Sequence, residues 1–169
     1  MYSRRDFSRI GIALAGGFAL EAGSGGMTAN GAEAPAERFE VMKTEEEWRR
    51  ILTPEQFAIL RKQGTERAGT SPLDANEAPG TYVCAGCALA LFSSATKYHT
   101  GTGWPSFWQP LDNAVATNED RSFLMRRTEV HCRRCGGHLG HVFDDGPKPT
   151  GLRYCINGGA MNFIPKATG

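Results

Sequence analysis

The sequence has no excess of charge of either sign and, after its first thirty or so residues, no long hydrophobic run. Its 19 basic and 18 acidic residues leave a formal net charge of +1, so charge does not favour nucleic acid or an anionic membrane as a partner. A helix that spans a bilayer needs about 20 apolar residues, and no later segment supplies them. We therefore expect a mature chain that neither binds nucleic acid nor inserts stably into a membrane.

The chain also lacks internal repeats and any alternation of strands with helices, which excludes a parallel α/β sheet. Glycine is abundant instead, with 21 residues in 169, as is typical of a turn-rich β fold. Beyond Thr81, short runs of period two predict strands. These candidate strands are residues 81–84, 89–92, 122–132, 140–143, 152–157 and 160–165. The predicted fold class is mainly β (α+β), a compact antiparallel domain with short helices on its N-terminal side.

Two short helices are predicted before the strands. Each begins with a capping box, Thr44 with Glu47 and Thr53 with Gln56. In the second helix the buried stripe is predicted to be Phe57, Ile59 and Leu60, and Gly64 provides a natural end. The polar stretch 65–80 contains two prolines, so we expect a long surface connection there.

The first 34 residues predict an export signal. An Arg4-Arg5 pair precedes a weakly apolar stretch from Ile10 to Leu20 that is too short to span a bilayer. The paired arginines resemble a twin-arginine signal, and the alternative is an amphipathic N-terminal helix. The predicted division is a cleaved signal over residues 1–34 and a folded domain over residues 35–169, exported to a bacterial periplasm.

Four of the five cysteines stand in two Cys-x-x-Cys pairs that are far apart in the sequence. This pattern predicts a four-cysteine structural zinc site of the ribbon kind. Two disulfides or one redox pair are the alternatives in an oxidising compartment. A disulfide within one pair would close a very small loop and add little stability. The predicted zinc ligands are Cys84, Cys87, Cys132 and Cys135.

The fifth cysteine, Cys155, lies in a candidate strand. There Arg153 and Asn157 share its face, and a guanidinium beside a thiol favours the thiolate. Strand parity also places His141 and Asp145 on one face, and His138 joins them only if the intervening glycine bends the chain. A single cysteine is more often an inert buried residue, so parity alone leaves both interpretations open.

The stretch "GTGWPSFWQP" holds three aromatic residues outside any regular period. Trp104 can form the wall of a small apolar pocket. Phe107 and Trp108 either cap a core or contribute to that pocket.

Together, "SATKYHTGTGWPSFWQP", "EVHCRRCGGHLGHVFDDGPKPTG" and "RYCINGGAMNFIP" resemble the B-type methionine sulfoxide reductases, which reduce the R epimer of methionine sulfoxide. The resemblance implies two antiparallel sheets and one zinc ion on the four paired cysteines. It implies that Cys155 is the attacking thiolate and that Arg153 orients and activates it. Trp104 would receive the substrate methyl group, with His138, His141 and Asn157 at the sulfoxide oxygen. Phe107 joins the substrate-binding set, with Asp145 as a supporting residue.

The sequence departs from one common pattern of this family. Many members carry a resolving cysteine two residues before the tryptophan, where this chain has Thr102. With four cysteines on zinc, no second thiol remains to form an intramolecular disulfide. The expected sulfenic acid on Cys155 would then need an external thiol reductant, such as a thioredoxin-like protein.

Three other functions remain as alternatives: a zinc-ribbon binding module without catalysis, a thiol peroxidase, and nucleic-acid binding. The main basic cluster is interpreted as a solvated strand face or a docking surface for an acidic protein. It consists of Arg126, Arg127, Arg133 and Arg134.

Overall fold

A computed structural model describes residues 38–121 and 126–167 of the chain. The predicted export signal over residues 1–34, and residues 122–125 of one candidate strand, lie outside the described residues. Within the described ranges, no helix has both the length and the apolar character needed to cross a membrane.

Both predicted helices are present, as α1 (Glu45–Ile51) and α2 (Pro54–Lys62), and both capping boxes form. The end of α2 differs in one detail from the prediction. Gln63, with φ 53°, takes the left-handed conformation that ends the helix. Gly64 follows it and donates its N–H to the Ala58 carbonyl at 2.9 Å. A Cβ at Gly64 would lie 2.8 Å from that same oxygen, so glycine is needed here for close approach.

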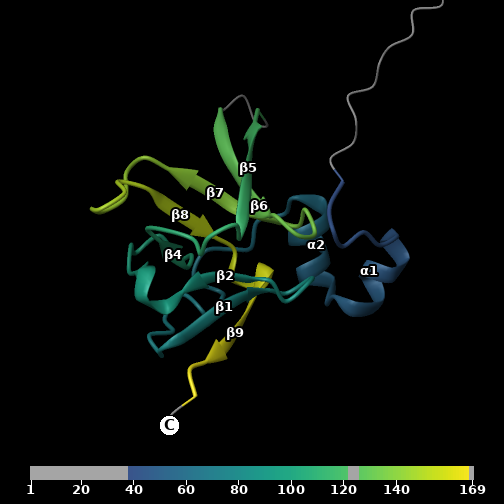
Figure 1. Ribbon diagram of the computed structural model, residues 1–169, viewed down its shortest axis with the longest axis horizontal. Coiled ribbons are helices and arrows are strands. Elements are labelled where there is room, and N and C mark those ends of the chain that lie inside the picture. The colour runs from purple at the N-terminus through teal and green to yellow at the C-terminus, as the bar shows by residue number, and fades with distance from the viewer. Residues whose placement is uncertain (1–37, 122–125, 168–169) are drawn as a thin grey trace, which may run out of the picture. The chain divides into compact units, whose positions relative to one another are not determined.

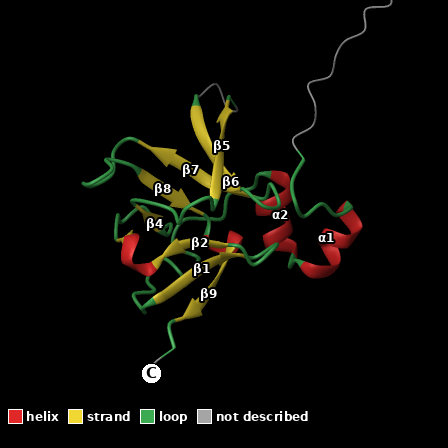
Figure 2. Cartoon of the chain, in the orientation of Figure 1, coloured by secondary structure: helices red, strands yellow, loops and turns green. Residues whose placement is uncertain are grey.

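The strands form two antiparallel sheets, which confirms the predicted fold class (Figures 1 and 2). The smaller sheet has the order β2-β1-β9, from β1 (Gly80–Cys84), β2 (Ala90–Ser93) and β9 (Met161–Pro165). The larger has the order β3-β4-β8-β7-β6-β5. Its strands are β3 (Lys97–Tyr98), β4 (Ser106–Phe107), β5 (Val115–Asp120), β6 (Arg127–Cys132), β7 (His138–Phe143) and β8 (Arg153–Ile156). Two short 3₁₀ helices complete the fold, η1 (Ser94–Thr96) and η3 (Gly158–Ala160).

Three strands were not predicted. β3 and β4 have two residues each, which is too short to show a period. β5 is mostly exposed and polar along "VATNED", so it lacks an apolar alternation. These strands form because neighbouring strands supply a hydrogen-bonding edge, and that edge is a tertiary feature.

Aromatic packing joins the two sheets. Phe107 of β4 stacks on Phe92 of β2 with ring centroids 4.3 Å apart, and it meets the Tyr82 ring of β1 edge-on at 5.0 Å. All three side chains are fully buried. Large buried aromatic side chains dominate the energetics of such a core. The two sheets are therefore held face to face at this point.

A bulge in β7 sets the side-chain directions near Cys155. β6 pairs with β7 through Glu129↔His141 and Val130↔Gly140, but His131 then pairs with His138, so the register shifts. Strand β8 runs against β7 with Cys155 directly opposite His141. Gly140 lies against the Cys155 carbonyl oxygen so closely that a Cβ would overlap it. The tight β7–β8 contact therefore requires glycine at this position.

Candidate active site and metal centre

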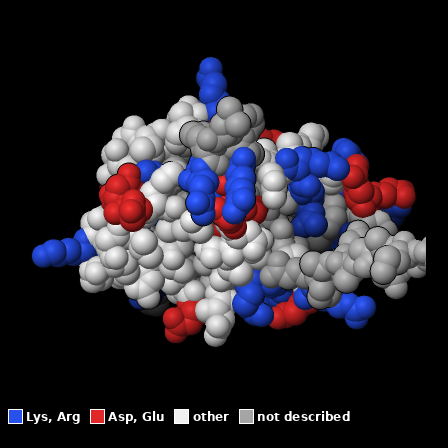
Figure 3. All heavy atoms as spheres, turned by 90° about the horizontal axis from the view of Figure 1, so that it is seen from above, with Lys and Arg blue, Asp and Glu red and all other residues white. Residues whose placement is uncertain are grey.

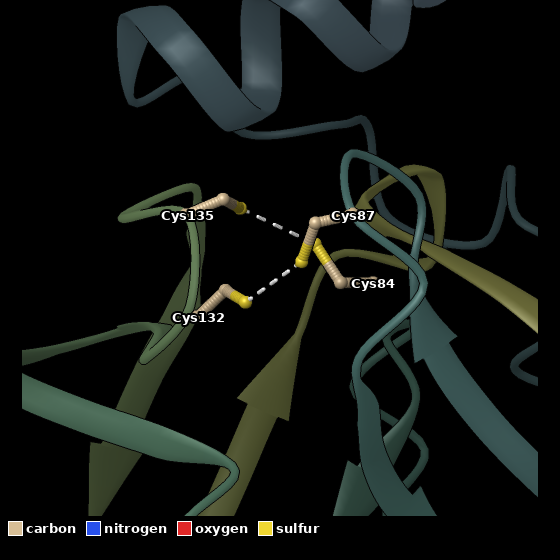
Figure 4. Close-up of side chains that lie close together, drawn as sticks. All are labelled: Cys84, Cys87, Cys132 and Cys135. Carbon is tan, nitrogen blue, oxygen red and sulfur yellow. Dashed lines mark hydrogen bonds between the residues drawn. The ribbon is translucent and has the colours of Figure 1, made fainter. Parts of the chain in front are cut away.

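The four paired cysteines converge at one point between the two sheets (Figure 4). Cys84 and Cys87 flank the turn after β1, and Cys132 and Cys135 flank the turn between β6 and β7. The Sγ atoms of Cys84 and Cys135 are 3.7 Å apart, and those of Cys87 and Cys132 are 3.5 Å apart. None of the five cysteines, all of which are described, forms a disulfide.

This thiol cluster fits a metal ion. Four sulfurs around a tetrahedral ion with bonds of about 2.3 Å lie roughly 3.8 Å from one another. All four Sγ atoms here lie within 4.8 Å of one another, and the observed close pairs match that geometry. Arg61 donates to the Cys135 carbonyl oxygen at 3.0 Å, which fixes one turn against α2. The two disulfides considered as an alternative are not present.

Cys155 lies apart from this cluster, in a pocket of about 170 Å³. The pocket, here called the Cys155 pocket, is lined by Thr65, Trp104, Arg127, Gly140, His141, Phe143, Cys155 and Asn157. Its residues come from β6, β7, β8 and two loops that are distant in sequence. A nucleophile, an imidazole, a guanidinium and two aromatic rings therefore share one small cavity.

Burial governs the acidity of the Cys155 thiol. Burial raises the pKa of Cys155 above its usual value, while the charge of Arg153 and a hydrogen bond from Thr102 act in the opposite direction. The effect of Arg153 predicted from strand parity is present, but desolvation is larger. In the ligand-free protein Cys155 is therefore mainly a thiol at neutral pH.

Arg153, a predicted catalytic residue, is not among the residues that line the Cys155 pocket, although its side chain packs on Phe143 of that lining. Its guanidinium makes two 2.8 Å hydrogen bonds to the Asp145 carboxylate and lies 4.4 Å from the Phe143 ring centroid. Asp145 does not line the pocket and is largely exposed. Its contact with Arg153 places it as a support for that guanidinium, next to the substrate space but outside it.

His141 points into the pocket and is anchored from behind. Its Nε2 lies 2.8 Å from Asp120 Oδ2, and Arg127 Nη2 donates to the same oxygen at 2.8 Å. Burial lowers the pKa of His141, and the Asp120 contact only partly offsets this. His141 is therefore predominantly neutral at neutral pH.

His138 is brought near His141 by the β7 bulge, with ring centroids 5.4 Å apart. Its side chain is buried, and its Nδ1 lies 2.7 Å from Glu129 Oε1. Gln63 donates to that carboxylate at 3.3 Å. His138 is not among the residues that line the Cys155 pocket, so it lies behind His141.

Asn157 and Trp104 are tied together through Glu66. The Glu66 N–H donates to Asn157 Oδ1 at 3.0 Å, and the Glu66 carbonyl accepts from Trp104 Nε1 at 3.2 Å. The Asn157 Nδ2 also donates to the Leu139 carbonyl at 3.0 Å. Much of the Asn157 amide is therefore engaged within the protein, and one Nδ2 hydrogen remains available to a ligand.

The Glu66 carboxylate completes this connection. It is buried and accepts 2.7 Å hydrogen bonds from the backbone N–H groups of Gly158 and Gly159. A Cβ at Gly158 would overlap the Ser71 side chain, so the close packing of this turn depends on glycine. Burial is the main cause that raises the pKa of Glu66. The stretch 65–80 was predicted to be a surface connection, and its residues are exposed or half-buried except Glu66, which is buried.

Phe107 was predicted to bind substrate, but its side chain does not line the Cys155 pocket. Its side chain is fully buried in the aromatic core between the sheets and is not part of the Cys155 pocket. Of the two roles considered for it, the structure shows core packing. The reason is strand parity, because Ser106 and not Phe107 pairs with Cys155 across β4 and β8.

Sequence reasoning assigned no site role to Thr65, Glu66, Asp120 or Arg127. Arg127 was grouped with a solvated basic cluster, yet it lines the pocket with 26% of its side chain exposed. Asp120 ends a polar strand that has no visible period. No local pattern could identify these residues, because strand pairing brings Asp120 and Arg127 to His141, and the fold of a loop brings Thr65 and Glu66 to the other residues of the site.

Comparison with known proteins agrees with this arrangement. The SelR domain family matches residues 52–165. A protein of Leptospira interrogans named peptide methionine sulfoxide reductase MsrB is 58% identical over 126 residues, covering 74% of this chain and 96% of the relative. Proteins of the same name from Methanosarcina barkeri and Bradyrhizobium diazoefficiens are 53% and 54% identical, covering 76% and 75% of this chain and 92% and 91% of the relatives.

The chain therefore belongs to the SelR domain family. Its relatives place it, within that family, among the MsrB methionine sulfoxide reductases, which are oxidoreductases.

The acidity of Cys155 gives a direct test of this geometry. Because burial favours the neutral thiol, the thiolate forms only as pH rises through a pKa above the usual value of about 8.5. Arg153→Met removes the nearby positive charge, so we expect that pKa to rise further. The measurement is the rate of Cys155 alkylation by iodoacetamide against pH, followed by peptide mass spectrometry. Arg133→Met, an exposed arginine between two metal-site cysteines, should leave the midpoint unchanged. A wild-type midpoint at or below 8.5 would contradict the burial argument.

Proposed function

We propose that this protein reduces the R epimer of methionine sulfoxide, free or in proteins, to methionine by nucleophilic attack of Cys155. The proposal rests on the observation that Cys155, His141 and Trp104 line the same pocket. The chain is also 58% identical to a relative that bears the name of this activity. Specificity for the R epimer follows from the resemblance to the B-type reductases.

The pocket suits a sulfoxide, which is a polar S=O group beside a small methyl group. The Trp104 indole is fixed by its hydrogen bond to Glu66, so its ring offers a rigid apolar wall for the methyl group. Arg127, His141 and Asn157 lie in the same cavity and carry polar hydrogens. Apolar walls with a few placed donors are typical of small-ligand sites.

In the proposed reaction the Cys155 sulfur attacks the substrate sulfur while the sulfoxide oxygen is protonated. The positive charge of Arg153 stabilises the thiolate that develops on Cys155. His141 donates a proton to the sulfoxide oxygen, or it orders a water molecule that donates this proton. The oxygen ends on Cys155 as a sulfenic acid, and methionine leaves. Substrate sulfur gains two electrons, and Cys155 sulfur loses two.

Regeneration of the enzyme would use an external thiol, such as that of a thioredoxin-like protein. Thr102 occupies the position of the resolving cysteine found in many family members, and its side chain is close enough to Cys155 to lower the pKa of that thiol. The remaining four cysteines converge elsewhere, in the metal centre. An outside reductant would therefore react with the sulfenic acid directly or through a mixed disulfide.

We further propose that Cys84, Cys87, Cys132 and Cys135 hold one structural zinc ion. Four thiolates leave no open coordination position, so the metal would supply a cross-link between the two sheets and no catalysis. Residues 1–34 are proposed to be a cleaved twin-arginine-like signal that directs residues 35–169 to a bacterial periplasm. Support for this signal is the Arg4-Arg5 pair and the short apolar stretch that follows.

Metal removal tests the zinc proposal. Structural zinc in small domains contributes an apparent binding free energy of about 10 kcal/mol or more. We therefore expect one zinc per chain by elemental analysis, and loss of cooperative thermal unfolding after chelation. Cys132→Ser should lose the metal, whereas Cys155→Ser should keep it. Unchanged thermal unfolding of the metal-free protein would disprove a structural role.

A single-turnover reaction tests the activity and the nucleophile together. The protein from residue 35 onward would be mixed with the R or the S epimer of N-acetyl-methionine sulfoxide without reductant. We expect one methionine per chain from the R epimer and one added oxygen on Cys155 by mass spectrometry. Cys155→Ser should show neither change. Equal turnover of both epimers would refute the stereochemical part, and activity in Cys155→Ser would refute the nucleophile.

The contact between Thr102 and Cys155 predicts the outcome of introducing a resolving thiol. In Thr102→Cys, the new thiol should condense with the Cys155 sulfenic acid after one turnover, and the chain should lose two hydrogens relative to the reduced variant. Non-reducing peptide mapping would locate the disulfide. Thr102→Ser is the matched control and should retain the sulfenic acid. A persistent sulfenic acid in Thr102→Cys would mean that the two side chains cannot reach disulfide geometry.

A further inference from the structure

Two paired charged side chains, Arg127 of the pocket lining and Asp120, have no step assigned to them in the reaction proposed above. Asp120 is the last residue of β5 and Arg127 the first of β6, and their Cα atoms are partners in the β5–β6 pairing. Arg127 Nη2 donates to Asp120 Oδ2 at 2.8 Å. Arg127 precedes Thr128, whose Cα partner across the β6–β7 pairing is Val142.

Asp120 determines which nitrogen of His141 carries the proton. Its Oδ2 lies 2.8 Å from His141 Nε2, and the two side chains are 20% and 13% exposed. An ionised carboxylate can only accept a hydrogen bond, so the hydrogen of this contact belongs to Nε2. In the neutral imidazole, Nδ1 is then the basic nitrogen.

Charged and titratable groups surround His141 on several strands. Asp120 comes from β5, Arg127 and Glu129 from β6, His138 from β7 itself, and Cys155 from β8. Burial is the first cause that lowers the pKa of His141, and Arg127 and His138 act in the same direction. Neutral His141 with a basic Nδ1 is therefore the state that meets the substrate.

Arg127 brings a permanent positive charge to the same cavity. It lines the Cys155 pocket together with Trp104 and His141. A guanidinium offers five N–H donors in one plane. The sulfoxide oxygen carries partial negative charge, which grows as the Cys155 sulfur attacks. Fixed donors aimed at such growing charge are among the largest contributions to catalysis.

We propose that Arg127 is a catalytic residue that stabilises the sulfoxide oxygen, and that Asp120 is a positioning residue that holds His141 with its proton on Nε2. The proposal rests on the function proposed above and extends it. It assigns Asp120 at the end of β5 and Arg127 at the start of β6 to the active site.

The proton balance of the reaction follows from this arrangement. As the Cys155 sulfur forms its bond to the substrate sulfur, the thiol proton passes to His141 Nδ1. His141 then returns that proton to the sulfoxide oxygen, which Arg127 has polarised. The S–O bond of the substrate breaks as its OH group passes to the Cys155 sulfur, and the bond between the two sulfurs breaks to release methionine. No external proton or oxidant is consumed before the sulfenic acid is reduced.

The first test measures the tautomer of His141 in the wild-type protein by ¹⁵N NMR, independently of activity. We expect a neutral imidazole with its hydrogen on Nε2. In Asp120→Asn, whose amide can also donate, we expect loss of this single tautomer. A hydrogen on Nδ1 in the wild type, or an unchanged tautomer in Asp120→Asn, would overturn the role of Asp120 whether or not the variant is stable.

The second test compares single-turnover rates with the R epimer. Asp120→Asn and Arg127→Met should each slow the reaction by about 100-fold, the scale of a lost acid–base or electrostatic contribution. Arg127→Lys should recover part of the loss because it keeps the charge. We also expect the pH dependence of the rate to change in Asp120→Asn and to be retained in Arg127→Lys. These effects should occur with metal content and thermal unfolding unchanged.

Glu119 provides a matched control on the same strand. It is exposed and pairs with Arg121 at 2.8 Å and Arg126 at 2.7 Å, away from the pocket lining. Figure 3 shows that basic and acidic side chains are intermingled on this face. Glu119→Gln removes the same charge and should retain the wild-type rate. An equal loss in Glu119→Gln would show a general charge effect and overturn the proposal.

The outcomes separate this inference from the proposed function. A wild-type protein that reduces neither epimer would refute the proposed function, while the NMR experiment would still decide the role of Asp120. A wild-type protein that is active, with Arg127→Met equally active, would refute the role of Arg127 alone.

Discussion

The pairing of β7 with β8 is the constraint on which the active site depends. It places His141 opposite Cys155, and it tolerates no side chain at Gly140, which lies against the Cys155 carbonyl. The bulge in β7, where that strand pairs with β6, brings the His138 ring close to His141. A shift of register by one residue would turn His141 and Cys155 away from each other. The chemistry of the pocket is therefore fixed by backbone hydrogen bonds.

A second level of order comes from buried polar groups that hold the pocket from behind. Glu66 connects Trp104, Asn157 and the turn after β8 by hydrogen bonds to its backbone and carboxylate. Burying a carboxylate is costly unless its oxygens are hydrogen-bonded, and two backbone N–H groups meet that need. Asp120 and Glu129 anchor His141 and His138 in the same way. Residues that line the Cys155 pocket or lie near it are thus oriented by buried or half-buried carboxylates.

The five cysteines lie in two environments: four form the metal centre, and Cys155 lines the Cys155 pocket. The paired cysteines stand on two turns, one from each sheet, so a metal ion there would tie the sheets together. The fully buried rings of Tyr82, Phe92 and Phe107 join the same sheets by packing. Cys155 lies outside the metal centre and is half-buried in the Cys155 pocket. Phe107 was predicted to bind substrate, and the structure shows it packed in this aromatic core.

The sequence by itself determined the features that are local. Capping boxes set the starts of α1 and α2, Cys-x-x-Cys spacing indicated the metal centre, and contiguous motifs around Trp104 and Cys155 indicated the family. Tertiary structure alone decided the short strands β3 and β4, the burial of Glu66, and the meeting of Asp120 and Arg127 with His141. The physical reason is that local signals act over one turn or one strand, whereas strand register and desolvation depend on partners many residues away. The net acidity of Cys155 belongs to the second group, because the charge of Arg153 can be read from the sequence and the burial that outweighs it cannot.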